Sequence, residues 1–380
     1  MTDQAADTGL QLFSTATDDN RLELSLRRVP VPRPGAEEVV VRVEATPLNP
    51  SDLGLLLSAA DPASFKVTVS GDQPVTTGTI PAALARVVAA RKGKPMPVGN
   101  EAAGTVVKAG ESAEAQALLG KTVAIAGGAM YTQNRLLRAR DCLVLPEGAT
   151  AEEGASSFVN PMTALAMVSV LRRAGEKALV HTAAASNLGQ MLVKLCRAEG
   201  IPLVNIVRSE EQVALLRSLG ATHVCNSASG EFMRELIAAI TETGAFLAFD
   251  AIGGGPLAGQ ILTAMEAAAV ARTPGFSVYG STQHKQVYLY GRLDSSPTQL
   301  TGGFGFAWGV GGWLLTPYLQ RLGAEEVATM RRRVAENLRT IFASHYTRRI
   351  TLQEALQPEN IIAYSKRATG EKYLITPAAS

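Results

Sequence analysis

The residues best suited to chemistry form a run of small side chains, "VHTAAASNLGQ", at 180–190. An apolar strand-like start, a turn of small residues and a helix-like continuation predict a phosphate-binding strand–turn–helix unit. Small residues are needed because backbone N–H groups must approach a pyrophosphate, which then lies at the positive end of the helix. Ala and Ser suit such a turn if it needs no positive φ at their positions, and an ordinary α/β turn is the alternative. The expected dinucleotide contacts in the turn are Ala184, Ser186, Asn187, Leu188 and Gly189.

A basic residue stands where a dinucleotide fold selects its cofactor. The residue that meets the adenosine ribose lies about 20 positions beyond the turn, at the end of the second strand. Counting 19 residues from Gly189 leads to Arg208. An acidic side chain there would accept hydrogen bonds from a free 2′-hydroxyl, whereas a guanidinium binds a 2′-phosphate. We therefore predict NADPH as the cofactor, and the alternative is an ordinary surface arginine at a strand end.

Strands and helices alternate from about residue 155 onward. Strands are expected at 176–183, 202–208, 222–226 and 245–254, and helices at 187–200, 209–220 and 230–242. Repeated β-α-β units of this length require a parallel sheet with right-handed crossovers. The fold class predicted here is α/β, with a doubly wound parallel sheet.

The chain before residue 155 has a different character. Short β-type runs separated by Gly, Pro and Asn are found at 38–45, 102–110, 121–127 and 142–146. They favour a compact, mostly antiparallel β domain. An insertion rich in Pro, Gly and Ala covers about 61–97, and its middle is expected to form a short helix. We predict one domain over 1–155 and 340–380 and a second over 156–339.

Composition excludes several classes of protein. The 380 residues carry 36 basic and 34 acidic side chains, a net charge of +2, and 46% are hydrophobic, which is typical of a folded chain without a nucleic-acid-binding charge excess. The first 13 residues lack the pattern of a secretory signal, and the apolar window 304–319 is too short and glycine-rich to span a membrane. The three cysteines form no C-x-x-C pair and indicate neither a disulfide framework nor a zinc site. A cytoplasmic protein with small-molecule partners, and none among nucleic acids or membranes, is expected.

Six motifs in a fixed order resemble those of the medium-chain dehydrogenase/reductase superfamily over nearly the whole chain outside the insertion. They are "NPSDLG" (49–54), "PVGNEAAGTVV" (97–107), "NPMTALAM" (160–167), the turn at 180–190, "LRSLGATHV" (216–224) and "FDAIGG" (249–254). The chain is most similar to the zinc-independent branch of quinone oxidoreductases and mitochondrial-type 2-enoyl thioester reductases. The resemblance implies a GroES-like catalytic domain, a Rossmann domain and a final segment that returns to the catalytic domain.

The resemblance also implies where the nicotinamide and the substrate bind. The nicotinamide contacts that it implies are Asn160, Thr163, Ile252, Gly253, Tyr290 and Gly291. The window 304–319 falls where the family places both pocket and dimer-contact elements. It would either line an apolar pocket for a flat ring around Trp308 and Trp313, or form the subunit interface of a homodimer.

Zinc is not expected. The alcohol dehydrogenase branch of the family has a Cys in the first motif and a His in the second, and the matching residues here are Asn49 and Asn100. Neither side chain offers the thiolate or imidazole that zinc prefers. The four-cysteine structural lobe of that branch is also missing from the sequence. Metal-dependent alcohol oxidation is therefore an improbable function for this chain.

NADPH donates a hydride, and without a metal the acceptor of this hydride must already be electrophilic. A quinone and a double bond conjugated to a carbonyl are two such acceptors. The protein must then bind, orient and stabilise negative charge on the acceptor oxygen. Asn49 and Asn100 are candidate hydrogen-bond donors for this task, and a turn-forming role is the alternative. Asp52 is expected to brace the loop rather than react.

The source of the proton separates the two acceptor classes. Enoyl thioester reductases of this family carry a tyrosine that serves as the proton donor about eleven residues after the Asn of the first motif. This chain has Ala60 at that position. Tyr131 is the candidate that remains, although such a tyrosine often serves packing. A reduced quinone can take its proton from water instead. We predict an NADPH-dependent reductase of quinones or similar activated carbonyl compounds. The alternatives are a 2-alkenal or enoyl thioester reductase and a non-catalytic NADPH-binding redox sensor or structural protein.

Overall fold

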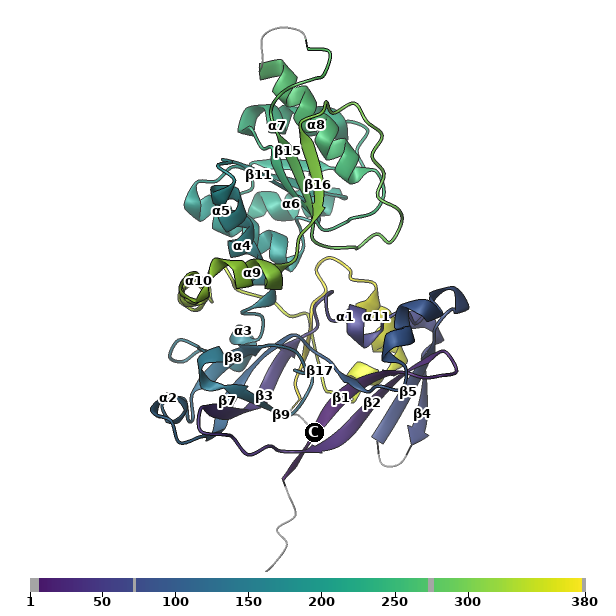
Figure 1. Cartoon of the computed structure of the whole chain (residues 1–380), viewed down its shortest axis with the longest axis vertical. Helices are drawn as coiled ribbons and strands as arrows, with labels where there is room; N and C mark the ends of the chain where they lie inside the picture. The colour runs from purple at the N-terminus through teal and green to yellow at the C-terminus, as the bar shows by residue number, and fades with distance from the viewer. Residues whose placement is uncertain (1–6, 71–72, 273–276, 378–380) are drawn as a thin grey trace, which may run out of the picture. The chain divides into compact units, whose positions relative to one another are not determined.

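A computed structural model describes residues 7–70, 73–272 and 277–377 of the chain. The chain divides into two compact units, whose elements are labelled in Figure 1. Unit 1 comprises Met1–Val159 and Arg331–Ser380, and unit 2 comprises Asn160–Met330. The predicted boundaries, at 155 and 339, lie within ten residues of these divisions.

Unit 1 is built on two mainly antiparallel sheets. The first has the order β4-β5-β2-β1-β6 and the second β10-β8-β7-β3-β18-β17, with β9 also paired to β3. The first sheet contains β1 (Thr8–Ala16), β2 (Arg21–Pro30), β4 (Lys66–Ser70), β5 (Gln73–Thr79) and β6 (Met96–Pro97). The second contains β3 (Glu38–Pro47), β7 (Glu101–Ala109), β8 (Thr122–Ala126), β9 (Asn134–Arg138), β10 (Leu143–Val144), β17 (Arg348–Ile350) and β18 (Tyr373–Ile375).

The predicted insertion is part of the first sheet rather than a separate lobe. Its strands β4 and β5 form an antiparallel hairpin that pairs with β2, and its expected helix is the 3₁₀-helix η2 (Ala82–Arg91). The C-terminal segment returns to the second sheet, because β18 pairs antiparallel with β3. The other short helices of unit 1 are α1 (Leu53–Leu56), η1 (Pro62–Ser64), α2 (Ala113–Gln116), η3 (Ala139–Asp141), α3 (Ala151–Gly154), η4 (Glu354–Leu356) and α11 (Pro358–Ser365).

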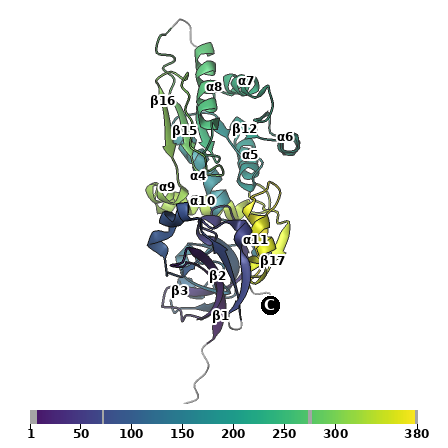
Figure 2. The same ribbon diagram turned by 90° about the vertical axis from the view of Figure 1, so that its right-hand side faces the viewer.

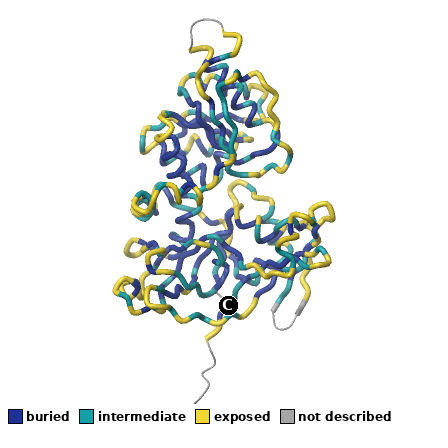
Figure 3. The backbone as a smooth tube through the Cα atoms, viewed as in Figure 1, coloured by how far each residue is buried: buried dark blue, intermediate teal, exposed yellow. Residues whose placement is uncertain are grey.

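The core of each unit follows the period of its strands. In β3, the alternate residues Val39, Val41 and Val43 enter one apolar cluster of unit 1, as the period of two along a strand requires. Figure 3 shows the central strands of both units as buried backbone. Polar side chains within these strands are therefore costly unless they are hydrogen-bonded.

Unit 2 contains a six-stranded parallel sheet with the order β13-β12-β11-β14-β15-β16. Figure 2 shows β15 and β16 together, and they form one end of this sheet. Its strands are β11 (Leu179–His181), β12 (Leu203–Val207), β13 (His223–Asn226), β14 (Leu247–Asp250), β15 (Lys285–Leu289) and β16 (Trp308–Gly312). Its helices are α4 (Val159–Arg173), α5 (Asn187–Glu199), α6 (Glu210–Ser218), α7 (Phe232–Thr243), α8 (Leu257–Arg272), α9 (Leu315–Leu322) and α10 (Ala324–Glu336), of which α4 and α10 continue into unit 1.

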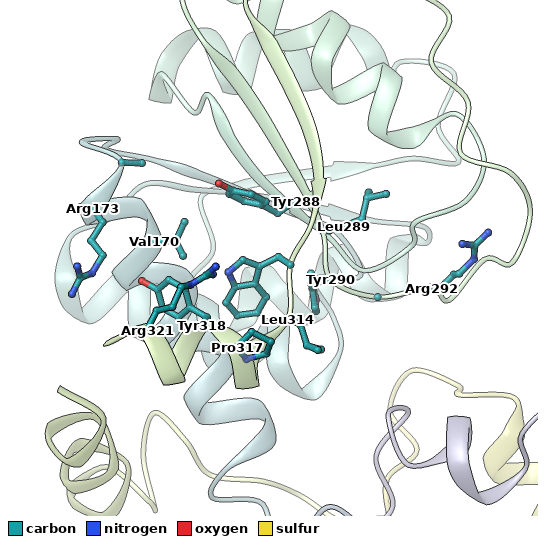
Figure 4. Close-up of a pocket in the computed structure, with 14 residues that line it drawn as sticks. Val170, Arg173, Tyr288, Leu289, Tyr290, Arg292, Leu314, Pro317, Tyr318 and Arg321 are labelled. Atoms are coloured by element: carbon teal, nitrogen blue, oxygen red, sulfur yellow. The ribbon is translucent and has the colours of Figure 1, made fainter. Parts of the chain in front are cut away.

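Helices cover both faces of this sheet. Helices α7 and α8 pack on one face through a cluster that includes Val180 and Val287. Tyr288, the next residue along β15, lies beside Val170 of α4 (Figure 4). Successive strand residues point to opposite faces, so α4 covers the other side. The doubly wound arrangement predicted from the sequence is confirmed.

One helical stretch, Ala151–Arg173, is long and apolar enough to cross a membrane. Its most apolar window is 83% buried inside the protein. Such burial is typical of the core helix of a folded domain.

Candidate active site

The predicted phosphate turn lies between β11 and α5. Ser186 is the N-cap of α5, and its hydroxyl accepts a hydrogen bond from Gly189 N at 3.2 Å. A Cβ added to Gly189 would lie 2.1 Å from Ala184 O, so only glycine fits this contact between helix and turn. The positive φ of the turn, +48°, falls on Ala183 and not on Ala184 or Ser186. Ala184 and Ser186 therefore suit this turn, because neither position requires a positive φ.

Arg208 follows β12, which pairs in parallel with β11. Because the carboxyl ends of parallel strands share one edge of a sheet, Arg208 and the turn lie at the same edge. The backbone N–H of Arg208 donates to Gln212 Oε1 at 3.0 Å, and the side chain is exposed. Its guanidinium forms no ion pair with the described residues. The turn and the start of α5 fit the pyrophosphate of an NAD(P)-type dinucleotide, and Arg208 adds an exposed positive charge at the same edge.

A buried carboxylate shapes the backbone after β14, where Ile252 and Gly253 were predicted to meet the nicotinamide. Asp250 Oδ1 accepts hydrogen bonds from Thr182 Oγ1 at 2.7 Å and from Ile252 N at 2.9 Å, and its Oδ2 accepts from Gly253 N at 3.1 Å. A Cβ on Gly253 would lie 2.5 Å from Gly291 O. The structure thus brings Gly253 and Gly291, from the ends of β14 and β15, into backbone contact.

Tyr290, another predicted nicotinamide contact, is paired with a buried histidine. Its hydroxyl lies 2.8 Å from His181 Nε2, and the two rings stack with centroids 5.8 Å apart. Burial lowers the pKa of His181 to about 3, so the imidazole is neutral at physiological pH. Tyr290 is therefore held by a neutral hydrogen bond at the end of β15.

A groove of about 970 Å³ in unit 2 contains Tyr290 and Gly291 (Figure 4). Its walls are aromatic and apolar, with Tyr288, Trp313, Tyr318 and Leu314 among them. Arg173 and Arg321 lie on the side of Tyr318, whereas Arg292 lies apart, beyond Leu289. Trp313 lines this groove, whereas Trp308 packs on Phe304 with ring centroids 4.9 Å apart, so the groove does not contain both tryptophans as the pocket alternative would require.

The remaining two predicted nicotinamide contacts belong to the first turns of α4. Asn160 is half-buried and Thr163 is buried. Their contact with a nicotinamide stays a prediction.

Asn49, predicted to bind the acceptor oxygen, is buried inside unit 1 with 1% of its surface exposed. Its Nδ2 donates to Glu101 Oε1 at 2.8 Å, and its backbone N–H donates to Asp52 Oδ2 at 2.8 Å. Asp52 thus braces the loop, as predicted. Asn100 is half-buried and its Nδ2 donates to Ser51 Oγ at 3.1 Å. Of the two asparagines, Asn100 is the one whose amide retains access to solvent and to a ligand.

Tyr131, the predicted proton donor, is fully buried in the core of unit 1. Its hydroxyl donates to Pro47 O at 3.4 Å. Burial, together with the nearby carboxylate of Asp52, raises the pKa of Tyr131 well above its usual value. The placement corrects the expectation for this residue, because a buried hydroxyl with a raised pKa is poorly suited to protonate a bound substrate.

The residues of unit 1 do not suit a zinc ion. The side-chain amide of Asn49 is hydrogen-bonded to Glu101, and an amide is a weak zinc ligand compared with the thiolate or imidazole that zinc prefers. Within 7–70, 73–272 and 277–377, no three His, Cys, Asp or Glu side chains gather as a metal site would require. No step of the chemistry below uses a metal.

The architecture of this chain is shared by solved structures over nearly all of its length. The family model of the zinc-binding dehydrogenases matches residues 188–292. A candidate NADPH:quinone reductase of Mesorhizobium loti is 25% identical, covers 98% of this chain and 100% of its own, and gives a TM-score of 0.72. These two similarities support the medium-chain dehydrogenase/reductase superfamily, which the sequence motifs resemble. A mutant enoyl thioester reductase of Candida tropicalis, at 20% identity, 97% and 100% coverage and a TM-score of 0.67, shares the fold.

Among the curated relatives are enoyl reductases and homologs of a synaptic vesicle membrane protein. The mitochondrial enoyl-[acyl-carrier-protein] reductase of Xenopus tropicalis is 27% identical over 208 residues, which are 53% of this chain and 51% of that protein. The synaptic vesicle membrane protein VAT-1 homolog of Rattus norvegicus is 25% identical over 239 residues, which are 62% of this chain and 51% of that protein. The chain thus spans about half the length of these curated relatives.

The sequence reasoning missed five buried charged residues of these units: Glu101, Asp250, Glu266, Lys285 and Lys372. Asp250 and Glu101 stand inside motifs that were singled out, "FDAIGG" and "GNEAAG", so a signal for both was present. An acidic residue flanked by small and apolar residues in a strand is a candidate for burial with hydrogen-bond partners. Lys372, in "GEKYLI", offered no comparable motif.

Proposed function

We propose that this chain is an NADPH-dependent, zinc-free reductase that transfers a hydride to a quinone or a similar activated carbonyl compound. The observation that carries the proposal is the exposed guanidinium of Arg208 at the sheet edge that also holds the capped turn. The solved relative from Mesorhizobium loti, whose name includes NADPH and quinone, supports the same cofactor and acceptor class.

NADPH, when bound, would supply the hydride, and the chain would bind and orient it. Arg208 would hold the 2′-phosphate, and the N-terminal turn of α5 would hold the pyrophosphate. Gly253 and Gly291 approach each other too closely for a side chain on Gly253, at the edge where the nicotinamide is predicted to lie. Asn100 Nδ2 would donate to the acceptor oxygen as negative charge develops on it. One proton from water completes the hydroquinone, so no acidic side chain is required.

A second candidate, reduction of an enoyl thioester or 2-alkenal, is favoured by the names of several relatives. That reaction places a proton on carbon after the hydride has arrived, and a positioned acid promotes this step. The position that carries the acid in such reductases is occupied here by Ala60, and Tyr131 is buried. The quinone proposal is therefore preferred.

The test is the oxidation of NADPH by purified protein with benzoquinone, phenanthrenequinone, a 2-alkenal and crotonyl-CoA, each repeated with NADH. We expect NADPH-specific turnover with quinones, and a loss of about tenfold to hundredfold in kcat/KM for Asn100→Ala. Faster turnover of crotonyl-CoA would favour the enoyl reductase. Tight NADPH binding with no turnover of any acceptor would favour a non-catalytic NADPH-binding protein.

A further inference from the structure

Glu101, the first residue of β7, is a carboxylate with 0% of its surface exposed. Its Oε1 accepts a hydrogen bond from Asn49 Nδ2 at 2.8 Å. Its Oε2 accepts two more, from Phe158 N and Val159 N, each at 2.8 Å. Those N–H groups lie at the start of α4, where the first turn of a helix has no partners of its own and favours negative charge. Glu101 therefore joins the Asn49 loop to the beginning of α4.

Lys372 supplies the positive charge that a buried carboxylate needs. It directly precedes β18, and its Nζ donates to Ser156 Oγ at 2.7 Å and lies 5.3 Å from the centre of the Tyr346 ring. Burial raises the pKa of Glu101, and the field of Lys372 opposes that rise. Ser156 is two residues before Phe158, so Lys372 and Glu101 both bind the same short segment.

These contacts tie Glu101 to the buried Asn49 and to two residues of the proposed site, Asn100 and Asn160. Asn49 donates a hydrogen bond to Glu101, and Asn100 directly precedes Glu101 in the chain. Asn160 directly follows Val159, whose backbone N–H donates to Glu101. We propose that Glu101, with Lys372 as its counter-charge, is a positioning residue that fixes these asparagines for the reaction. The proposal rests on the proposed function, because the positions of Asn100 and Asn160 matter only if these two residues meet the acceptor and the cofactor.

The first test is Glu101→Gln. The amide keeps the size of the side chain but offers one acceptor oxygen, so its NH₂ group must face either the Asn49 amide or the two N–H groups of α4. We expect kcat/KM for the quinone to fall about tenfold to hundredfold, mainly through kcat. The matched control is Glu266→Gln, the same change at a buried glutamate of unit 2 that contacts Lys285. It should lower the melting temperature at least as much and leave kcat and KM unchanged.

The second test is the pH profile of kcat/KM for Lys372→Met. The titratable groups whose charges act on Glu101 are Lys372, Asp52, Tyr131 and Tyr346. Without the lysine, Glu101 binds a proton at higher pH and accepts its three hydrogen bonds less well. The acid limb of the profile should move to higher pH, and Lys372→Arg should restore it. A purely structural role would change stability without moving this limb.

The proposal is overturned if Glu101→Gln stays within twofold of the wild type, or if Glu266→Gln loses as much activity. Should Glu101→Gln fail to fold, the pH profile of Lys372→Met decides, and an unmoved acid limb overturns the proposal. If the wild type reduces no acceptor, the proposed function fails. The dissociation constant of NADPH is then measured for each variant. A weaker binding of NADPH in Glu101→Gln but not in Glu266→Gln supports the positioning role, whereas the same dissociation constant in Glu101→Gln and the wild type overturns it. A chain that binds no NADPH overturns both.

Discussion

Each unit of this protein buries a glutamate opposed by a buried lysine, and the two arrangements differ. In unit 2, Lys285 Nζ lies 2.6 Å from Glu266 Oε2, and Ser281 donates to both oxygens of the same carboxylate. In unit 1, Lys372 donates to Ser156 and acts on Glu101 through space. The first pair is closed within residues 266–285, whereas Glu101 and Lys372 draw together segments from four parts of the chain.

The difference concerns what a buried charge can do. In a closed pair the two charges offset much of each other's desolvation cost, and here the pair joins α8 to the start of β15. The carboxylate of Glu101 is satisfied mainly by an amide and by N–H groups of a helix, so a change there moves neighbouring segments. Losing the Glu266–Lys285 pair should therefore mainly lower the stability of unit 2. Losing the Glu101–Lys372 pair should mainly impair the function of unit 1.

The largest expected effect on stability belongs to Lys285→Met. The change leaves the Glu266 carboxylate buried without its cation, and breaking such a pair costs about 3–5 kcal/mol. Lys372→Met should cost less than half as much, because burial already lowers the pKa of Lys372 to about 8 and its charge is expensive to maintain. The free energies of unfolding are measured by urea denaturation, with the transitions of the two units fitted separately. An equal loss in both variants would contradict the comparison.

The sequence identified the parts of the site that depend on backbone geometry. Gly189 was recognisable because a helix that packs closely on the preceding turn excludes every other residue. Gly253 and Gly291, by contrast, were named only through the family resemblance, although they too stand at a close backbone approach. The alternation of strands and helices also predicted the parallel sheet of unit 2, because right-handed β-α-β units allow few other arrangements. These constraints are local in sequence, and they can be recognised without the fold.

The placement of buried polar groups could not be predicted in this way. Asn49 was expected to face a substrate, yet it is spent on Glu101, 52 residues further along the chain. Tyr131 was the available acid, yet it lies in the core. Whether a polar side chain points inward depends on partners supplied by distant segments, such as β18 and the start of α4. Those partners become visible only when the sheets are assembled.

The next effect in size concerns Asp52 and the pH dependence of stability. Burial raises its pKa to about 7 from an ordinary value of 3.8, so the folded state holds a proton that the unfolded state releases over this range. Stability from Asp52 is therefore fully present below pH 4 and decreases as the pH rises to 7, with a slope of at most about 1.4 kcal/mol per pH unit. Asp52→Asn should flatten the dependence of the melting temperature between pH 4 and 7 relative to the wild type. If both proteins show the same slope, Asp52 is ionised in the folded state at low pH.

Arg208 should have the smallest effect on stability and a large effect on function, which is the opposite of Lys285. Its guanidinium is exposed and forms no ion pair with the described part of the chain, so Arg208→Ala should leave the melting temperature unchanged. The dissociation constant of NADPH, measured by fluorescence, should rise about tenfold to hundredfold, while that of NADH should stay the same, because only NADPH carries the 2′-phosphate. Arg234→Ala, at an exposed arginine of α7 that is paired with Glu231, is the matched control and should change neither constant. Unchanged NADPH binding in Arg208→Ala would mean that another residue holds the phosphate, and the charge at the end of β12 would then have no assigned role.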